Sequence, residues 1–437
     1  MRLAVPLAIL FLTATICYAN KTPERPYKLP ILPEDMEQRL AMIKVATYMG
    51  PENHSQQTRS GGGFTGSELF NLHKELRQLV HENLEEAPST RELELLKMIL
   101  IGKPGREIDC RAVKEIIKKR AKGGKGANPF DDGYVVNNLM EKYRLTADRR
   151  YLDNAVVLAD FMMDDLKSRK RDGRQAFETW AAGHCWLGLG RGYAGVAEVM
   201  LAIANKTEYH ESKAIHGSEE GTGKTYADRL SPWMAELRDL IDFRESNDKY
   251  DNGKLYQTLK EKNYKGGPAA VNRFLYYTHF LCAAASAAET LDPVANKAWV
   301  AGQRKRVKEI IEYFQRSCVR PAQLHKGWWT KDLINHWDEE QQAYSCEYGL
   351  YDIWAYKPER HTTEDYIHLH MDMEAFDDIF RHVPGGISES FMKKMAVGLM
   401  IGTYDYETGY IPFNFGSRTG NKNPLTQPPW HTFFCPI

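Results

Sequence analysis

The feature that most constrains the fold is a helical hairpin that recurs along the chain. Each unit has helical segments with apolar residues at helical spacing, and a short turn containing Asp, Asn, Pro or Gly separates or ends them. The first helix of a unit is apolar around much of its circumference, as expected for a helix enclosed by others, and the second is amphipathic. The predicted units lie at 134–166, 193–207, 273–314 and 370–403.

Repeated hairpins of this kind predict an all-α fold in which inner helices are surrounded by outer ones, an α/α toroid. We expect a single large domain over residues 20–437, with the repeats at about 130–410. No window shows the sustained alternation of polar and apolar residues that is typical of strands. An irregular α-solenoid is the alternative architecture. Further helices are predicted at 34–49, 67–83, 89–101 and 111–120.

The first 19 residues read as an export signal. Arg2 is followed by a short apolar run, and Cys17-Tyr18-Ala19 ends in small residues that suit cleavage after Ala19. The run is too short for a permanent membrane anchor, and no later segment has enough uncharged apolar residues to span a bilayer. We therefore expect a soluble protein, secreted or periplasmic, with no membrane partner.

Charge and cysteine content narrow the function further. The 58 basic and 58 acidic residues balance, which argues against a nucleic-acid partner held by bulk charge. The cysteines after the signal are widely spread and include no Cys-x-x-Cys, a spacing unlike structural zinc sites or disulfide scaffolds. Residues 218–225 look like a phosphate-binding loop, but its first position is not glycine and no buried strand precedes it. We predict a long loop there and expect no cofactor.

Polar side chains gather near the entry of each predicted inner helix. Because such entries open on one face of a toroid, we expect these groups to converge on one cavity. The densest group is 360–372, next to a helix amino terminus, where free N–H groups favour an anionic ligand. The candidates are Asn137, Asn138, His184, Trp186, Arg191, Tyr193, Asn272, Arg273, Tyr276, Tyr277, His279, Arg360, Tyr366, His368, His370 and Asp372.

Two further patterns were weighed as binding sites. His368-x-His370-x-Asp372 has metal-binding residue types, but residues two apart on a helix point to different sides, so no metal is expected. Trp328 and Trp329 are candidates for a sugar-binding rim, because sugar rings stack on indole faces.

The phrase Glu-Lys-Tyr-Arg-Leu-Thr-Ala-Asp-Arg-Arg-Tyr-Leu at 141–152, preceded by Asn137-Asn138, resembles the repeats of α/α-toroid carbohydrate enzymes. With its export signal and its Asn, His, Arg and Tyr groups, the chain resembles polysaccharide lyases that act on uronic acids, such as alginate and glucuronan lyases. One alginate-lyase group has Asn-Asn-His where this chain has Asn137-Asn138-Leu139, so the chain departs from the pattern of that group.

The resemblance implies β-elimination on an acidic polysaccharide, with the substrate carboxylate neutralised by hydrogen bonds so that the C5 proton can be removed. Tyr366 is then the base and acid, and Arg360 lowers its pKa. Tyr277 is the rival tyrosine. The groups expected to hold the carboxylate are Asn138, His184 and His368. The remaining expected substrate contacts are Asn137, Trp186, Arg191, Arg273, His279, Trp328, Trp329 and His370.

Two other function classes stay open. A toroid glycoside hydrolase would need a Glu/Asp pair, for which the candidate residues are Glu178, Asp338, Glu339, Glu340 and Glu347. An epimerase would act on the same sugars. A non-catalytic glycan-binding protein would bind such polymers without changing them.

Overall fold

A computed structural model of the chain is mostly helical, as the all-α prediction requires. It describes residues 64, 66–82, 87–101, 110–123, 126–173, 177, 181, 186–211, 213–216, 219–247, 250–255, 269, 271–317, 319–321, 346–348 and 366–388. The export signal and the helices predicted at 34–49 and 390–403 lie outside these residues. The helices are α3 (Gly66–Glu82), α4 (Thr90–Ile101), α5 (Cys110–Lys122), α6 (Pro129–Thr146), α7 (Arg149–Arg171), α9 (Trp186–Asn205), η2 (Thr207–Tyr209), α10 (Ala227–Asn247), α11 (Val271–Leu291), α12 (Lys297–Ser317) and α14 (Tyr366–His382).

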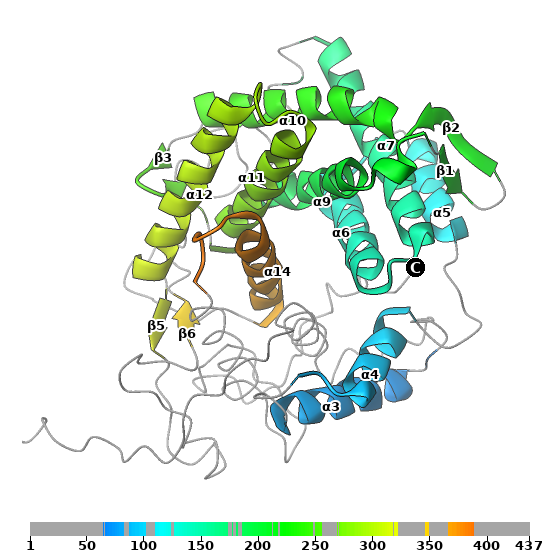
Figure 1. Cartoon of the computed structure of the whole chain (residues 1–437), viewed down its shortest axis with the longest axis vertical. Coiled ribbons are helices and arrows are strands. Elements are labelled where there is room, and N and C mark those ends of the chain that lie inside the picture. Colours follow the sequence, from blue (N-terminus) through cyan, green and yellow to red (C-terminus); the bar gives the residue numbers. More distant parts are fainter. Residues whose placement is uncertain are drawn as a thin grey trace, which may run out of the picture.

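The helices from α6 onward form two layers. In the inner layer α9 packs against α6 on one side and α11 on the other, and α11 also packs against α14. In the outer layer α7 contacts α6 and α9, α10 contacts α9 and α11, and α12 contacts α11. Figure 1 shows α12, α10 and α7 on the left, top and right of this part of the chain, with α11, α9, α6 and α14 between them. No helix in the described part of the chain is long and apolar enough to cross a membrane.

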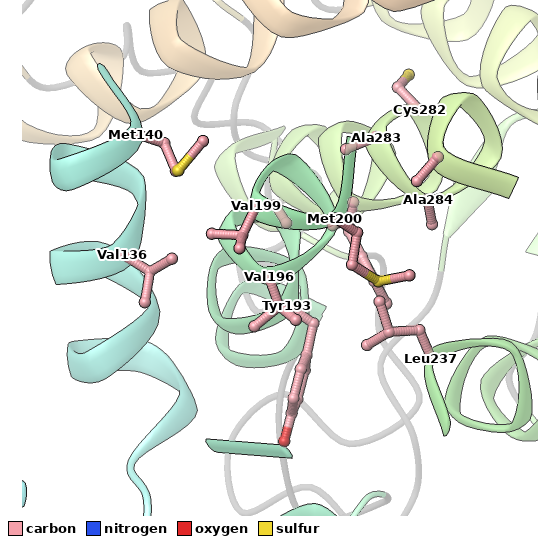
Figure 2. Packing of buried hydrophobic residues seen from close by; sticks show 14 of the residues in the cluster. Val136, Met140, Tyr193, Val196, Val199, Met200, Leu237, Cys282, Ala283 and Ala284 are labelled. Carbon is pink, nitrogen blue, oxygen red and sulfur yellow. The ribbon is translucent and has the colours of Figure 1, made fainter. Parts of the chain in front are cut away.

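The core is centred on α9, which is buried along nearly its whole length (Figure 2). Tyr193, Val196 and Met200 of this helix are fully buried. Neighbouring helices supply the rest of the packing, including Val136 of α6 and Leu237 of α10. Removal of this apolar surface from water is the main force holding the two layers together.

Glycines allow the inner helices to approach each other backbone to backbone. A Cβ atom added at Gly133 of α6 would lie 2.3 Å from Cα of Gly192 on α9. One added at Gly190 of α9 would lie 2.5 Å from the backbone nitrogen of Tyr277 on α11, and one at Gly195 would lie 2.4 Å from Oδ1 of Asn137. A larger side chain at Gly133 or Gly190 would push the helices apart, and one at Gly195 would displace the Asn137 side chain.

Helix α6 starts five residues earlier than the apolar pattern predicts, because its first turn and its amino-terminal cap consist largely of polar residues. Asn128 accepts a hydrogen bond from the Phe130 N–H at 3.2 Å, and Pro129 occupies the first helical turn. A capping Asn followed by Pro is a standard helix start. Asp131 and Asp132 complete the first turn, where carboxylates are favoured.

The turn between α6 and α7 matches the predicted one. Ala147 adopts a left-handed conformation with φ of 54°, and its N–H donates to the Tyr143 carbonyl at 2.7 Å. Asp148 then caps α7 by accepting from the Arg150 N–H at 3.0 Å. The predicted helices at 67–83, 89–101, 111–120, 151–166, 273–291 and 299–314 are confirmed, with ends shifted by a few residues.

The loop predicted at 218–225 is wrong. Most of it forms strand β2 (Glu219–Thr225), which pairs with β1 (Lys213–His216) as an antiparallel hairpin. Two further two-stranded pairs are described: β3 (Tyr250–Asp251) with β4 (Lys254–Leu255), and β5 (Val319–Pro321) with β6 (Cys346–Tyr348).

Helix α10 directly follows this hairpin and was not predicted. It begins with a capping box: the Thr225 N–H donates to Asp228 Oδ2 at 2.7 Å, and the Asp228 N–H donates to Thr225 Oγ1 at 3.3 Å. Pro232 lies inside the helix and is the residue that argues against a helix in the sequence.

A buried lysine joins α6 to α7. Lys142 is 4% exposed, and its ammonium nitrogen lies 5.9 Å from the centroid of the Tyr151 ring. Burial lowers the pKa of Lys142 to about 8, because the charged form is poorly solvated there.

Replacing Gly190 by Ala should destabilise the protein, since the new methyl group meets the α11 backbone. We expect a loss of about 1–3 kcal/mol from overpacking. The matched control is Gly302→Ala on α12, where a Cβ atom meets nothing within 4 Å. That change should add about 0.5–1 kcal/mol through helix propensity alone. Equal melting temperatures for the two variants in calorimetry would refute the close approach of α9 and α11.

Lys142→Met should change how stability depends on pH. The folded protein gives up the lysine proton near pH 8, whereas the unfolded chain keeps it to about pH 10.4. Wild-type stability should therefore rise across that interval by up to about 3 kcal/mol. The variant should lack this rise and be more stable than wild type at pH 7. Urea unfolding at several pH values measures the difference, and parallel curves for the two proteins would contradict it.

Candidate functional site

Three inner helices bring two imidazoles and two carboxylates together. His279 Nε2 of α11 lies 2.7 Å from Asp378 Oδ2 of α14 and 3.5 Å from Glu198 Oε1 of α9. His382 Nε2, one turn beyond Asp378, lies 2.6 Å from the same Glu198 oxygen. We call Glu198, His279, Asp378 and His382 the imidazole–carboxylate cluster. Its residues are far apart in the sequence, so only the packing of α9, α11 and α14 assembles it.

Two arginines border the cluster. Arg381 Nη2 lies 3.0 Å from Asp377 Oδ2 and also donates to Asp378 Oδ1. Arg144, near the end of α6, has Nη1 3.7 Å from Asp378 Oδ1 and donates from Nη2 to Glu141. The two oxygens of Asp378 therefore have different neighbours. Oδ1 faces the guanidinium groups and Oδ2 faces the imidazole of His279.

The local sequence of α14 explains its part in this arrangement. Asp378, Arg381 and His382 are three and four residues apart, so they share one face of the helix. Another face is apolar: Phe376 packs with its ring centroid 5.1 Å from that of Phe314 on α12. The helix is thus held by its apolar face while its charged face meets α9 and α11.

The cluster shifts the pKa values of its members. Burial alone would raise the pKa of Glu198, but the adjacent His382 and His279 hold it well below its usual range. Burial alone would lower the pKa of His279, but Asp378 and Glu198 raise it to about 9. The pKa of His382 is also raised, by Glu198 against the effect of burial. The site therefore strongly favours positive charge at its centre.

A second group of polar residues lies in the amino-terminal halves of the inner helices. The guanidinium carbon of Arg191 lies 3.4 Å from the ring centroid of Tyr134, 4.4 Å from that of Phe130 and 5.8 Å from that of Tyr276. Asn137 Nδ2 of α6 donates to the Arg191 carbonyl at 3.4 Å. Arg191 is buried, so these aromatic faces replace much of its hydration.

The structure thus brings several of the predicted site residues together. Asn137 and Arg191 meet across α6 and α9, and the Tyr276 and His279 rings lie 6.2 Å apart on α11. Tyr277 is fully buried, with its ring centroid 6.1 Å from that of Phe280. The side chains of Asn138 and Arg273 are half-buried.

Other predicted residues are placed in part or not at all. Trp186 is the first residue of α9 and Tyr366 the first of α14, where His368 and His370 also lie. The side chains of these four residues lie outside the described part of the structure. The predicted residues wholly outside it are His184, Trp328, Trp329 and Arg360.

Sequence reasoning did not single out Glu198, Asp378 or His382. A signal for Glu198 exists: it is an acidic residue within an otherwise apolar segment, Gly-Val-Ala-Glu-Val-Met-Leu. A carboxylate in a buried helix needs a partner, so such a residue marks a buried interaction. The partner itself cannot be read from the sequence, because it is on another helix.

Comparison with known proteins identified no relative of this chain. No protein family matches the chain, and no curated protein or solved structure is significantly similar to it. Two groups of residues in the inner helices are therefore the basis for a functional proposal. One is an aromatic and amide group at the start of the inner helices. The other is a charged cluster further along the same helices.

Replacing Arg381 tests how much its positive charge stabilises the neighbouring carboxylates of Asp377 and Asp378. Arg381→Met would leave the buried carboxylates Asp377 and Asp378 with less positive charge, so we expect a loss of about 2–4 kcal/mol. The control is Arg150→Met, which removes a more exposed ion pair with Asp148 and should cost less than about 1 kcal/mol. Chemical unfolding at neutral pH measures both. Equal losses would mean that the buried pair is no more important than the exposed one.

Proposed function

We propose that the chain is an exported enzyme that cleaves a uronic-acid polysaccharide of the alginate or glucuronan type by β-elimination. The observation that supports it most is the shared direction of α6, α9 and α11. Gly133 and Asn137 of α6 meet Gly192 and Gly195 of α9 in the same order along both helices. Gly190 and Glu198 of α9 likewise meet Tyr277 and His279 of α11 in order. Their amino-terminal ends therefore lie on one side, as the proposed active site needs.

The proposal includes a toroid architecture. An α/α toroid requires inner helices that run in one direction, each followed by an outer helix that returns the chain. The order α6, α7, α9, α10, α11, α12, α14 alternates inner and outer helices in this way. In the proposed fold α14 continues the inner layer.

The chemistry needs a group that removes the C5 proton and groups that neutralise the neighbouring carboxylate. We assign the proton transfer to Tyr366, because it begins α14, where unpaired N–H groups favour both a phenolate and an anionic sugar. The rival Tyr277 has a fully buried side chain within the core, so a polymer does not reach it. Asn138, half-buried on α6, is assigned to the carboxylate together with His184 and His368, and Arg360 to the phenolate.

A second candidate function has one observation in its favour. Glu198 and Asp378 have carboxylate oxygens within 4.8 Å of each other, close to the separation of about 5 Å found in retaining glycosidases. Both carboxylates already contact imidazole or guanidinium groups, which weakens them as acid and nucleophile. The lyase therefore remains the preferred proposal.

Tyr366→Phe should abolish cleavage, while Tyr277→Phe should leave it nearly intact. The loss at Tyr366 should be about 100-fold or more, since proton transfer by a positioned side chain contributes that much. The assay incubates the purified chain with alginate, with glucuronan and with a neutral glycan. It follows ultraviolet absorbance from unsaturated ends and, separately, the release of reducing ends. Tyr277→Phe is the matched control because it also removes a phenolic hydroxyl, but from a tyrosine in the core.

Each other result contradicts part of the proposal. Reducing ends without ultraviolet absorbance would identify a hydrolase. Binding of the polymers without any cleavage would identify a glycan-binding protein. Activity that survives Tyr366→Phe but not Tyr277→Phe would reverse the assignment of the base.

A further inference from the structure

The imidazole–carboxylate cluster has a geometry that ion pairing alone does not explain. The His279 side chain is 3% exposed, and neither ring nitrogen makes a hydrogen bond to a described residue. Its Nε2 atom nevertheless lies 2.7 Å from Asp378 Oδ2 and 3.5 Å from Glu198 Oε1. These contacts are close enough for an ion pair but do not have the geometry of a hydrogen bond. Buried imidazoles normally donate a hydrogen bond, so this convergence requires another explanation.

We propose that Glu198, His279 and Asp378 bind one Zn²⁺ ion between α9, α11 and α14. One ligand atom from each residue lies within 4.8 Å of the other two. The inference is independent of the proposed lyase activity, since it concerns residues outside the assigned proton-transfer machinery.

The donor set selects the kind of ion. An imidazole nitrogen with two carboxylate oxygens suits a first-row divalent metal, whereas Ca²⁺ and Mg²⁺ prefer oxygen ligands alone. Zn²⁺ binds histidine nitrogen and carboxylate oxygen at about 2.0–2.2 Å, so its ligand atoms lie roughly 3–3.5 Å apart. In the structure, His279 Nε2 and Asp378 Oδ2 are 2.7 Å apart, and all three ligand atoms lie within 4.8 Å of one another. These separations lie on both sides of the range that zinc requires. Small side-chain rotations bring all three atoms to one ion.

The surrounding residues orient these ligands as outer-shell groups do in metal sites. Arg381 and Arg144 contact Oδ1 of Asp378, which leaves Oδ2 directed at the centre. His382 Nε2, 2.6 Å from Glu198 Oε1, holds that carboxylate in place. Partners of this kind fix the direction of a ligand and raise its affinity for the ion.

Charge at the site agrees with a cation. Among the described residues, two guanidinium groups contact three carboxylates, those of Glu141, Asp377 and Asp378. A fourth carboxylate, that of Glu198, contacts the two imidazoles. A divalent ion balances the remainder with both imidazoles neutral, which is the form that binds metals. Without a metal, protons on the two histidines would balance the same negative charge, and metal binding would release these protons.

Zinc at this position would join three inner helices across their buried faces. It would fix α14 against α9 and α11, and with it the backbone of Tyr366 at the start of that helix. Three protein ligands would leave the fourth position of a tetrahedral ion to water. Because His279 and Asp378 are buried between the helices, we assign the ion to holding the fold rather than to chemistry.

The test uses the full purified chain, stripped of metal with a chelator and then dialysed. Zn²⁺ titrated into it by calorimetry should bind with a stoichiometry of one and raise the melting temperature, since a ligand of the folded state stabilises it. His279→Gln and Asp378→Asn should each weaken binding by at least 100-fold. The matched control is His210→Gln, whose Nε2 lies 3.1 Å from the Ile203 carbonyl outside the cluster, and it should bind as wild type does.

A spectroscopic arm keeps the test decisive if the ligand variants do not fold. X-ray absorption of the zinc-loaded wild type should show nitrogen and oxygen ligands at about 2.0–2.2 Å, including imidazole scattering. Absence of stoichiometric zinc binding, unchanged affinity in His279→Gln, or a spectrum of hydrated ion without imidazole would each overturn the proposal. Tighter binding of Ca²⁺ or Mg²⁺ than of Zn²⁺ would overturn the choice of ion.

Discussion

The close approach of α6, α9 and α11 is the contact on which the rest of the structure depends. At Gly133, Gly190 and Gly192 the helices touch through their backbones, so no side chain can set their spacing there. Glycine weakens an isolated helix by about 1 kcal/mol per residue, and α9 tolerates several because tertiary packing replaces what propensity loses. As a result, the apolar side chains of α9 are buried against α6, α10 and α11 (Figure 2).

This tight core makes charge inside the molecule both costly and specific. Moving a carboxylate or an imidazolium out of water costs several kcal/mol unless an opposite charge or a metal replaces the lost hydration. The imidazole–carboxylate cluster and the two bordering arginines provide such partners from α6, α9, α11 and α14. Apolar packing tolerates small shifts along a helix axis, whereas oppositely charged atoms 2.6–2.7 Å apart do not. The cluster therefore fixes the register in which α14 meets α9 and α11.

The helices were largely predictable from the sequence, and the exceptions have physical causes. Apolar periodicity located α3, α4, α5, α7, α11 and α12, but it missed the start of α9, where glycines lower the helical signal. It missed α10, which contains Pro232, and the β1–β2 hairpin, whose strands are mostly polar. Among the site residues, His279 and Arg191 were recognised by type. Their partners were not, because a contact such as His279 with Asp378 depends on how helices far apart in sequence align.

The polar residues at the two ends of the inner layer make different kinds of contact. At the amino-terminal halves, Arg191 lies close to aromatic rings and Asn137 donates to the α9 backbone, so both side chains are held by contacts within the protein. In the proposed lyase, the proton-transfer group is therefore placed at a helix start, at Tyr366, which is the first residue of α14. Further along, the cluster fixes α14 itself. The proposed lyase would need such a rigid anchor on the helix that carries its proposed base, because a misplacement of 1 Å at the reacting atoms can cost about 100-fold in rate.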